Sequence, residues 1–413
     1  MMDACGHRLR VAWMVSLLTE ASLRSQKSPS TSEVSPSKII QLVRERPPGY
    51  GGVERVAHEM ANEWWRQGFS VRTVCLQPPA EESTGSLLPV SYEIVSLPRL
   101  SLGQFLCPLP SRRLFNVLNE SATLHVHLPC PALLLLSILA RLRRPQRIIR
   151  LHWHAFLQPP VGPTGWLIRL YQRIALLWAA VGVQSVITTS PVLAGVLQSE
   201  GVPRKRVLVL PCCLGEDQER MALQTAHAKR PEMLVRLRPL RLLFIGRLDS
   251  YKRVDWLIDA IAHIRDVRLD VVGDGPQRKV LQRLAASSGC AGVIRFHGRL
   301  EEEKKQELLS QSHLLVLPAD RSNEAFGIVQ LEAMAYGVPA LALDCRRSGA
   351  AWVGQLKHVI GLPRLGRKEL PEAIHRLIED PWMLHHASKA AERRYKRIFA
   401  RSIWQARFAE LLP

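Results

Sequence analysis

Apolar and polar residues form alternating blocks along the chain, and these blocks predict strands and helices that follow one another. In the first half, short apolar or β-branched runs predict strands at residues 38–43, 71–76, 123–127, 147–152, 185–189 and 207–210. Apolar residues between Val53 and Trp64 recur at helical spacing, directly after a Pro/Gly loop. Strands that alternate with helices are typical of a parallel sheet with helices on both faces.

The second half repeats this pattern after a polar interruption. Strands are predicted at residues 241–247, 268–272, 293–297, 314–317 and 340–343, and helices are predicted to begin near Val254, Gln277, Glu302 and Ala325. We therefore expect an α/β protein with two doubly wound, Rossmann-like parallel-sheet domains that face a cleft. Ligands of such folds bind beyond the carboxyl ends of the strands.

Breaks in the pattern give the expected domain boundaries. Residues 1–36 include a Ser/Pro-rich tract and are expected to be a disordered leader without a signal-peptide cleavage pattern. The N-terminal domain is expected at residues 37–214, the linker at 215–238, the C-terminal domain at 239–390, and a C-terminal helix at 391–413 that could pack back on the N-terminal domain.

Composition narrows the class of protein. With 413 residues, of which 47% are hydrophobic and 22% charged, the chain is long enough for two cores and has the composition of a soluble globular protein. Its longest largely apolar run, residues 131–140, covers about half of the roughly 20 residues that a membrane span requires. The 8 cysteines are scattered and form no CxxC pair, which favours a reducing cytoplasm over a disulfide framework or a zinc ribbon.

The charge distribution indicates a polyanionic partner. Lys and Arg outnumber Asp and Glu by 56 to 36, a net charge of +20, and no acidic residue lies between Glu120 and Glu200. That segment contains Arg141, Arg143, Arg144, Arg147, Arg150, Arg169 and Arg173. Arginines interleaved with Leu and Trp favour contact with an anionic membrane surface, and a solvated basic face is the alternative. Nucleic acid is not an expected partner, because no recognised nucleic-acid-binding motif is present.

Two motifs could hold a phosphate group. Gly51 and Gly52 stand between the first predicted strand and the first predicted helix, where free backbone N–H groups can meet an anion; a simple turn is the alternative. The loop is not the GxGxxG fingerprint of dehydrogenases. Arg247 and Lys252 follow the first strand of the second half and could neutralise a diphosphate without a metal, unless they are ordinary surface cations.

A third motif is the segment from Glu324 to Glu332, EAFGIVQLE, in which two glutamates lie eight residues apart. If both lay on one helix they would project from the same side, and one carboxylate could bind sugar hydroxyls while the other holds ribose hydroxyls. Phe326 and Gly327 would offer backbone N–H groups at the helix N-terminus. A helix with one capping and one surface glutamate is the alternative.

Two His-x-His sequences, His125/His127 and His152/His154, each stand at the end of a predicted strand. A metal pair is conceivable, but no carboxylate or cysteine nearby in sequence would complete it, so no metal site is expected. We expect His154 at the cleft, hydrogen-bonded to a sugar hydroxyl, and structural packing for the other three.

Together these residues resemble glycosyltransferase family 4, whose members have the GT-B fold. The resemblance covers nearly all of the chain from residue 38 onwards and rests on the segments PPGYGGVERVAHEMA, HVHLPCP, RLHWHAF, ITTSP, LFIGRLDSYKRVDWLIDAI, VVGDGP and EAFGIVQLEAMAYGVPAL. It implies an acceptor-side N-terminal domain and a nucleotide-sugar-binding C-terminal domain. Carried over by motif, Gly51 and Gly52 would contact the donor phosphates, His154 the transferred sugar, Arg247 and Lys252 the diphosphate, and Glu324 and Glu332 the sugar and the ribose.

The resemblance also implies the reaction: a retaining, metal-independent transfer of a hexose from a nucleoside-diphosphate sugar to a glycan or a lipid-linked acceptor. RSNEAFGIVQLEAMA with HWH is similar to the mannosyltransferase-like branch, which favours GDP-mannose, then a UDP-hexose, as donor. A cytoplasmic protein at the inner face of the membrane is expected. Ala155-Phe156 departs from the Ser-Asp that often follows HWH in that branch, and residues 358–363 replace its usual glycine-rich stretch. The alternative is a catalytically silent, glycan-binding or scaffold protein with the same fold.

Overall fold

The computed structural model describes residues 37–49, 51–76, 90–102, 105–233 and 239–411. By its internal contacts the chain divides into two units, residues 1–37 and residues 38–413. The helices and strands described here all belong to the second unit. The expected leader, residues 1–36, lies outside the described residues.

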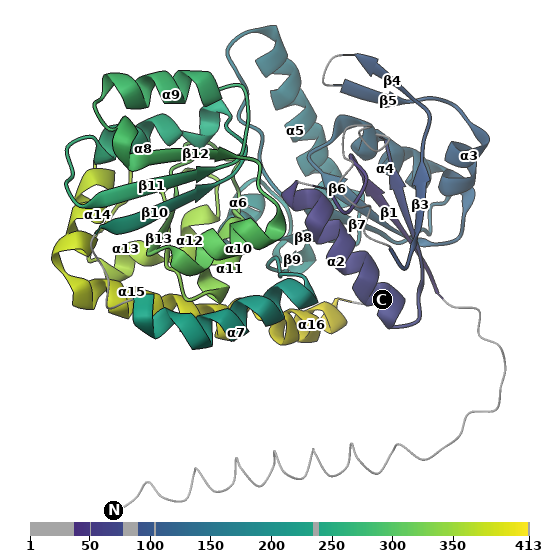
Figure 1. Cartoon of the computed structure of the whole chain (residues 1–413). Coiled ribbons are helices and arrows are strands. Elements are labelled where there is room, and N and C mark those ends of the chain that lie inside the picture. The colour runs from purple at the N-terminus through teal and green to yellow at the C-terminus, as the bar shows by residue number, and fades with distance from the viewer. Residues whose placement is uncertain (1–36, 50, 77–89, 103–104, 234–238, 412–413) are drawn as a thin grey trace, which may run out of the picture. The chain divides into compact units, whose positions relative to one another are not determined.

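The first half of this unit is built on a 7-stranded sheet in which all neighbouring strands are parallel, in the order β3-β2-β1-β6-β7-β8-β9 (Figure 1). Its strands are β1 (Lys38–Val43), β2 (Ser70–Cys75), β3 (Glu93–Ser96), β6 (Thr123–Leu128), β7 (Ile149–Trp153), β8 (Ser185–Thr188) and β9 (Val207–Val209). A separate antiparallel hairpin joins β4 (Arg99–Leu102) and β5 (Phe105–Pro108). β1, β6 and β8 are almost wholly buried, as expected for a sheet with helices on both faces, whereas the edge strands β3 and β9 are half-buried.

Each face of this sheet has its own apolar core. One face packs against α3 (Arg112–Asn119), α4 (Pro131–Arg143), α5 (Pro163–Val181) and α6 (Pro191–Ser199). The other face packs against α2 (Gly52–Arg66) and α16 (Arg401–Glu410), the last helix of the chain. Trp64 of α2 lies against Phe408 of α16, with ring centroids 5.2 Å apart. The end of the chain is thereby anchored to the first half.

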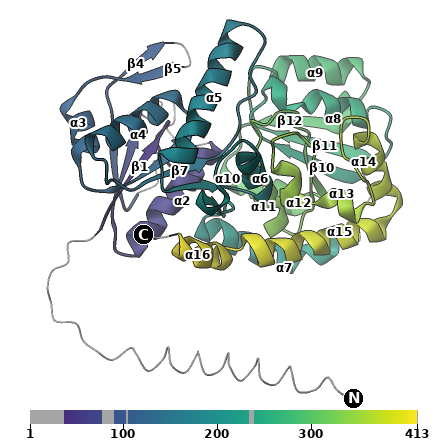
Figure 2. The same cartoon turned by 180° about the vertical axis from the view of Figure 1, so that it is seen from behind.

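The second half is built on a 5-stranded parallel sheet in the order β12-β11-β10-β13-β14 (Figure 2). Its strands are β10 (Leu240–Ile245), β11 (Val267–Val272), β12 (Ile294–Gly298), β13 (Leu314–Leu317) and β14 (Ala340–Ala342). Its helices are α8 (Val254–Ile261), α9 (Arg278–Ser287), α10 (Glu302–Gln311), α11 (Val329–Ala335), α12 (Ala350–Gly354), α13 (Leu356–Val359), α14 (Leu370–Glu379) and α15 (Pro381–Arg394). The predicted fold class, two doubly wound parallel sheets, is confirmed.

Some elements differ from the sequence prediction. The segment β3 to β5 was not predicted, because these strands have only four residues each and β3 is no more than half-buried. The polar segment expected as a linker contains a helix, α7 (Glu216–Met233), whose first turn is acidic and so favours a helix N-terminus. The helix expected near Ala325 begins only at Val329, because Gly327 has a φ of +72° and interrupts helical geometry.

Candidate functional site

The loops at the carboxyl ends of β1, β7, β10 and β13 carry all the site residues predicted from the sequence except Gly52, the first residue of α2, and Glu332, which lies in α11. The loop after β1 carries Gly51, the one after β7 carries His154, the one after β10 carries Arg247 and Lys252, and the one after β13 carries Glu324, Phe326 and Gly327. The carboxyl ends of parallel strands are where ligands of such sheets bind.

Lys252 and Glu324 form an ion pair between the loops that follow β10 and β13. Their side chains are only 13% and 12% exposed. Burial alone would lower the pKa of Lys252, but the adjacent Glu324 carboxylate outweighs burial and raises it, so the ammonium group stays charged. A charged ammonium group at the carboxyl ends of the adjacent strands β10 and β13 is suited to bind a phosphate oxygen.

Arg247 belongs to the same loop but has a different environment. Its side chain is 73% exposed, and its Nε lies 3.2 Å from a carboxylate oxygen of Asp249. The backbone beneath it is fixed: Gly246 N–H donates to the Val272 carbonyl at 3.0 Å, and a Cβ at Gly273 would lie 2.0 Å from the Gly246 oxygen. Arg247 therefore combines a closely packed backbone with an exposed guanidinium group.

Glu332 is 1% exposed and pairs with two cations. Its Oε1 lies 2.5 Å from Arg55 of α2, and its Oε2 lies 3.1 Å from Lys305 of α10. Burial favours a raised pKa for Glu332, but the two cations reverse this effect and hold the pKa below its usual value. The carboxylate is charged and joins α11 to the first half of the unit through Arg55.

The expectation that Glu324 and Glu332 project from one helix is wrong. Glu324 lies five residues before Val329, the first residue of α11, and its side chain points at Lys252, while Glu332 lies in the first turn of α11. Gly327 sets this geometry, because a Cβ there would lie 2.5 Å from Leu317. Phe326 turns its ring into the core, edge-on to Phe399 with centroids 6.0 Å apart.

Gly51 and Gly52 lie at the start of α2 as predicted, with Gly51 as its N-cap. A Cβ at Gly51 would lie 1.9 Å from a carboxylate oxygen of Glu54, whereas a Cβ at Gly52 would meet nothing within 4 Å. Burial raises the pKa of Glu54 to about 7. The glycine loop therefore has a closed side, occupied by a carboxyl group, and an open side at Gly52.

The four histidines form one buried cluster on a single face of β6 and β7, where His127 is paired with His152 in the strand register. His125 Nδ1 lies 2.8 Å from His152 Nε2, and His127 Nδ1 lies 2.9 Å from His154 Nε2. Burial lowers the pKa of all four rings, that of His154 to about 4. All four imidazoles are therefore neutral at physiological pH.

Gln41 of β1 fixes the tautomer of His154 through His127. The Gln41 amide nitrogen donates to the Ala57 carbonyl at 3.0 Å and to Thr73 Oγ1 at 3.2 Å, so the amide oxygen faces His127 Nε2 at 2.9 Å. His127 must donate from Nε2, and its Nδ1 must accept from His154 Nε2–H. His154 is left with a lone pair on Nδ1, which makes it an acceptor for a hydroxyl donor.

Phe156, where the chain departs from the family pattern, lies in the core with 1% of its surface exposed. Its carbonyl accepts a hydrogen bond from Ser322 Oγ at 2.8 Å, which ties the loop after β7 to the loop after β13. The residue thus holds together two loops that carry predicted site residues.

Sequence reasoning missed Gln41, Glu54, Arg55 and Lys305 as members of the site. Gln41 had a signal, since it is a polar residue inside an apolar strand. The part of the chain that the structure describes contains no group of three or more His, Cys, Asp or Glu residues arranged to hold a metal ion. Among the same residues, no helix is both long and apolar enough to cross a membrane.

Two family models match the chain, one to each half. The model described as "Glycosyltransferase Family 4" matches residues 50–218, and the one described as "Glycosyl transferases group 1" matches residues 227–394. The D-rhamnosyltransferase WbpZ of Pseudomonas aeruginosa is 25% identical over 357 residues, 84% of this chain and 88% of WbpZ. The alpha-D-kanosaminyltransferase of Streptomyces kanamyceticus is 30% identical over 188 residues, 44% of this chain and 47% of that protein.

Solved structures give the same fold. Anabaena Alr3699/HepE in complex with UDP has a TM-score of 0.68 and 20% identity, covering 90% of this chain and 98% of that one. WaaG, a glycosyltransferase involved in lipopolysaccharide biosynthesis, has a TM-score of 0.62 and 16% identity, with 90% and 99% covered. Because the two family models between them span most of the described chain, we conclude that this protein belongs to glycosyltransferase family 4 and is a glycosyltransferase of the GT-B fold.

Proposed function

We propose that the protein is a retaining, metal-independent transferase that moves a hexose from a nucleoside-diphosphate sugar to a glycan or lipid-linked acceptor. The observation that carries this proposal is the buried Lys252–Glu324 pair at the carboxyl ends of β10 and β13. A donor diphosphate would take the Lys252 ammonium as a partner, and Arg247 would close over it from solvent. Together they would stabilise the negative charge that develops on the departing diphosphate.

The sugar and the nucleoside would meet the two glutamates and His154. Released from Lys252 by the diphosphate, Glu324 would accept hydrogen bonds from sugar hydroxyls. The backbone N–H groups of Phe326 and Gly327 would donate to the sugar or the diphosphate. Glu332 would hold the ribose hydroxyls, and His154 would accept from the transferred sugar through Nδ1. Gly52, on the open side of the glycine loop, and Gly51 would contact the donor phosphates.

In this proposal the N-terminal domain, residues 37–214, receives the acceptor, and the C-terminal domain, residues 239–390, binds the donor. GDP-mannose is the first candidate donor and a UDP-hexose the second. The second is supported by a fold neighbour, Anabaena HepE, which has been solved in complex with UDP and with UDP-glucose. A role in cell-surface polysaccharide or glycolipid synthesis is supported by the fold neighbour WaaG, a glycosyltransferase involved in lipopolysaccharide biosynthesis.

We further propose that the protein works in the cytoplasm at the inner face of the membrane, with its N-terminal domain on anionic lipid. The acid-free segment between Glu120 and Glu200 supports this. Its arginines are not equivalent, however. Arg147 is 5% exposed and donates to the backbone carbonyls of Ala122 and Val117, so it supports the fold and cannot meet a lipid.

The test is Lys252→Ala, with nucleotides screened by thermal shift and by transfer activity. A ligand that binds the folded state raises the melting temperature by mass action. We expect GDP or UDP to stabilise the wild type, and the substitution to reduce that shift and to lower transfer from the matching sugar nucleotide by about 100-fold or more, as for the loss of a charge-stabilising group.

Lys304→Ala is the matched control, because Lys304 is an exposed lysine on α10. It should leave the nucleotide shift and the activity unchanged. Activity of Lys252→Ala within about threefold of wild type would remove Lys252 from the diphosphate site. A stable protein with no response to any nucleotide would instead favour the alternative, a silent glycan-binding or scaffold protein.

A further inference from the structure

Helix α5 buries mainly small residues and leaves one face of large apolar residues exposed. The buried residues of this 19-residue helix are Gly165, Gln172, Ala175 and Ala179. Its exposed face carries Trp166, Leu167, Leu170, Ile174, Leu177 and Val181, with Leu177 64% exposed and Val181 66% exposed. This is the reverse of an ordinary surface helix, which turns its large apolar residues to the core.

The outward residues form one continuous stripe. At 3.6 residues per turn, the six side chains fall within an arc of about 100°. Arg169 and Arg173 are exposed along one edge of this arc. Figure 2 shows α5 on the outside of the 7-stranded sheet, beside α4. Helices that lie in the plane of a membrane surface typically have an apolar stripe of this length and width with cations along its edge.

The neighbouring surface continues the same pattern. On α4, which contacts α5, Leu135 and Leu142 are 52% and 71% exposed, and Arg143 and Arg144 are exposed beside them. The two leucines lie seven residues apart and therefore share one side of the helix. The helix that contacts α5 thus has an exposed apolar side of its own, again bordered by arginines.

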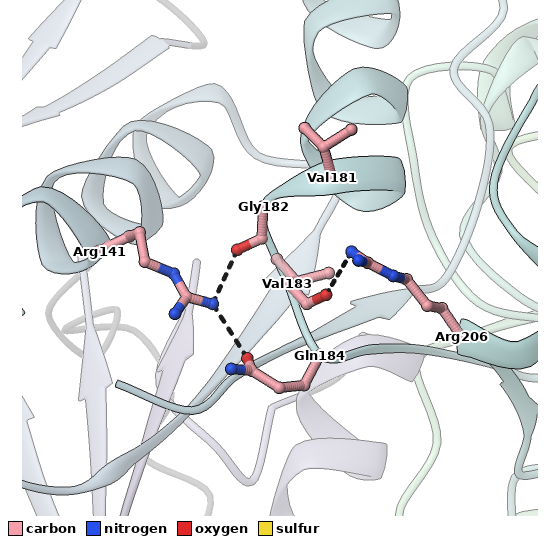
Figure 3. Close-up of a pocket in the computed structure, with 6 residues that line it drawn as sticks. All are labelled: Arg141, Val181, Gly182, Val183, Gln184 and Arg206. Atoms are coloured by element: carbon pink, nitrogen blue, oxygen red, sulfur yellow. Dashed lines mark hydrogen bonds between the residues drawn. The ribbon is translucent and has the colours of Figure 1, made fainter. Parts of the chain in front are cut away.

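A pocket of about 390 Å³ opens at the C-terminal end of α5 (Figure 3). Val181, the last residue of the stripe, lines it together with Arg141 and Arg206. Arg141 donates to the Gly182 carbonyl at 2.9 Å, and Arg206 donates to the Val183 carbonyl at 2.7 Å. Two guanidinium groups are therefore held at the C-terminal end of the apolar stripe, where lipid headgroups would lie.

We propose that α5 is the docking helix by which this protein binds the surface of an anionic bilayer, with the stripe from Trp166 to Val181 inserted at headgroup depth. Charge decides between lipid and a second copy of the chain. A twofold pairing of α5 helices would bring Arg169 and Arg173 towards identical arginines, with no acidic residue between Glu120 and Glu200 to compensate. Anionic lipid supplies the missing counter-charge.

This inference deepens the membrane contact in the proposed function and moves it from the arginines near Arg147 to α5. The test is sedimentation of the full chain with vesicles of phosphatidylcholine, with and without phosphatidylglycerol. The test variant is Leu170→Asn with Ile174→Asn, which breaks the stripe at its centre. The control is Trp382→Asn with Val280→Asn, which removes exposed apolar side chains on α15 and α9.

We expect the wild type to sediment with the anionic vesicles only. Leu170→Asn with Ile174→Asn should reduce the fraction bound to anionic vesicles by about tenfold or more, because two large apolar side chains no longer enter the bilayer. The control variant should bind as the wild type does. Arg169→Gln with Arg173→Gln should weaken binding at low salt more than Arg265→Gln with Arg268→Gln, two exposed arginines of the second half.

Equal binding of the stripe variant and the wild type, or no binding of the wild type to anionic vesicles, overturns the proposal. So does a wild-type dimer that the stripe variant converts to a monomer without any change in vesicle binding. Each sample is also tested for its thermal shift with UDP and GDP. A retained shift without vesicle binding counts against α5 alone, and intact vesicle binding without any nucleotide shift counts against the proposed transferase alone.

Discussion

At the scale of single residues, the site is controlled by buried polar groups that hold one another in a single protonation state. Gln41 is completely buried, and its amide nitrogen already has two acceptors, so its oxygen remains for His127. His127 in turn orients His154. Gln41 is therefore a positioning residue, since it acts on the site through two histidine rings.

Replacing Gln41 by Leu should release the tautomer of His154. Without an acceptor for its Nε2–H, His127 can reverse its tautomer, and the Nδ1 lone pair of His154 is then no longer enforced. The loss of buried hydrogen bonds should also destabilise the fold by about 1–3 kcal/mol. Nitrogen NMR of the histidine rings reports the tautomer directly.

Thr73→Ala is the control for this prediction. It removes the 3.2 Å contact to the Gln41 amide nitrogen but leaves the oxygen that faces His127. We expect His154 to keep its Nε2–H tautomer in the control. The same tautomer in Gln41→Leu would show that His154 is oriented by something other than Gln41.

Glu54 should make stability depend on pH. Burial raises its pKa from 4.5 to about 7, so the folded state prefers the protonated carboxyl. The stabilisation of the folded state by the protonated Glu54 carboxyl is fully present below about pH 4.5 and is lost as the pH rises to about 7. In total it amounts to about 3 kcal/mol at most. Glu54→Gln should therefore be more stable than the wild type at about pH 8 and similar to it at about pH 4.5.

Chemical unfolding across that pH range measures the difference, with Glu303→Gln, which changes an exposed glutamate of α10, as control. A wild type and a Glu54→Gln variant whose stabilities run parallel with pH would show that Glu54 is already ionised in the folded protein.

Part of the site was predictable at this scale because motif residues sit at strand ends. Lys252 and Glu324 were singled out from the sequence, and the structure brings them together. Arg55 and Lys305 were not, because their roles come from a partner, Glu332, which is 277 residues away from Arg55. Lys252 and Glu324 were recognised from the motif around each of them and not from their pairing, which spans 72 residues.

At the scale of elements, the buried strands were predictable because a strand with two covered faces is a continuous apolar run. β1 and β13 have the predicted bounds, Lys38–Val43 and Leu314–Leu317. The orientation of α5 was not predictable, because apolar residues surround this helix almost completely and its periodicity does not tell which side faces inward. In the structure the buried side of α5 carries mainly small residues, with Tyr171, Leu176 and Trp178 partly buried against the core, and six large apolar residues remain exposed.

At the scale of the whole described unit, net charge and its distribution were predictable but the function of each charge was not. Arg150, counted with the basic segment, donates to the carbonyl of Leu411 at the end of α16. Arg401 of α16 donates to Glu59 of α2 at 2.6 Å. Several cations that contribute to the net charge of +20 therefore connect distant parts of the fold.

Arg55 is the connection that bears most directly on the proposed donor site. It joins α2 to Glu332, the carboxylate that we propose for the ribose hydroxyls, at 2.5 Å. If ribose binds there, it must compete with Arg55 for the carboxylate. Glu332 would keep Lys305, 3.1 Å away, as its second partner.

Arg55→Ala tests this competition. Removing one partner of a buried carboxylate should destabilise the ligand-free protein by roughly 1–3 kcal/mol, less than for a fully buried pair because Arg55 is 30% exposed. The thermal shift caused by the cognate nucleoside diphosphate should be larger than in the wild type, because the ribose no longer displaces a cation. Arg66→Ala, which removes an exposed arginine from the same helix, should change neither quantity beyond the small effect of a surface ion pair. A smaller thermal shift with nucleotide in Arg55→Ala than in the wild type would contradict this prediction. It would show that Arg55 itself contacts the ligand, and that the Arg55–Glu332 ion pair between α2 and α11 does not compete with ligand binding.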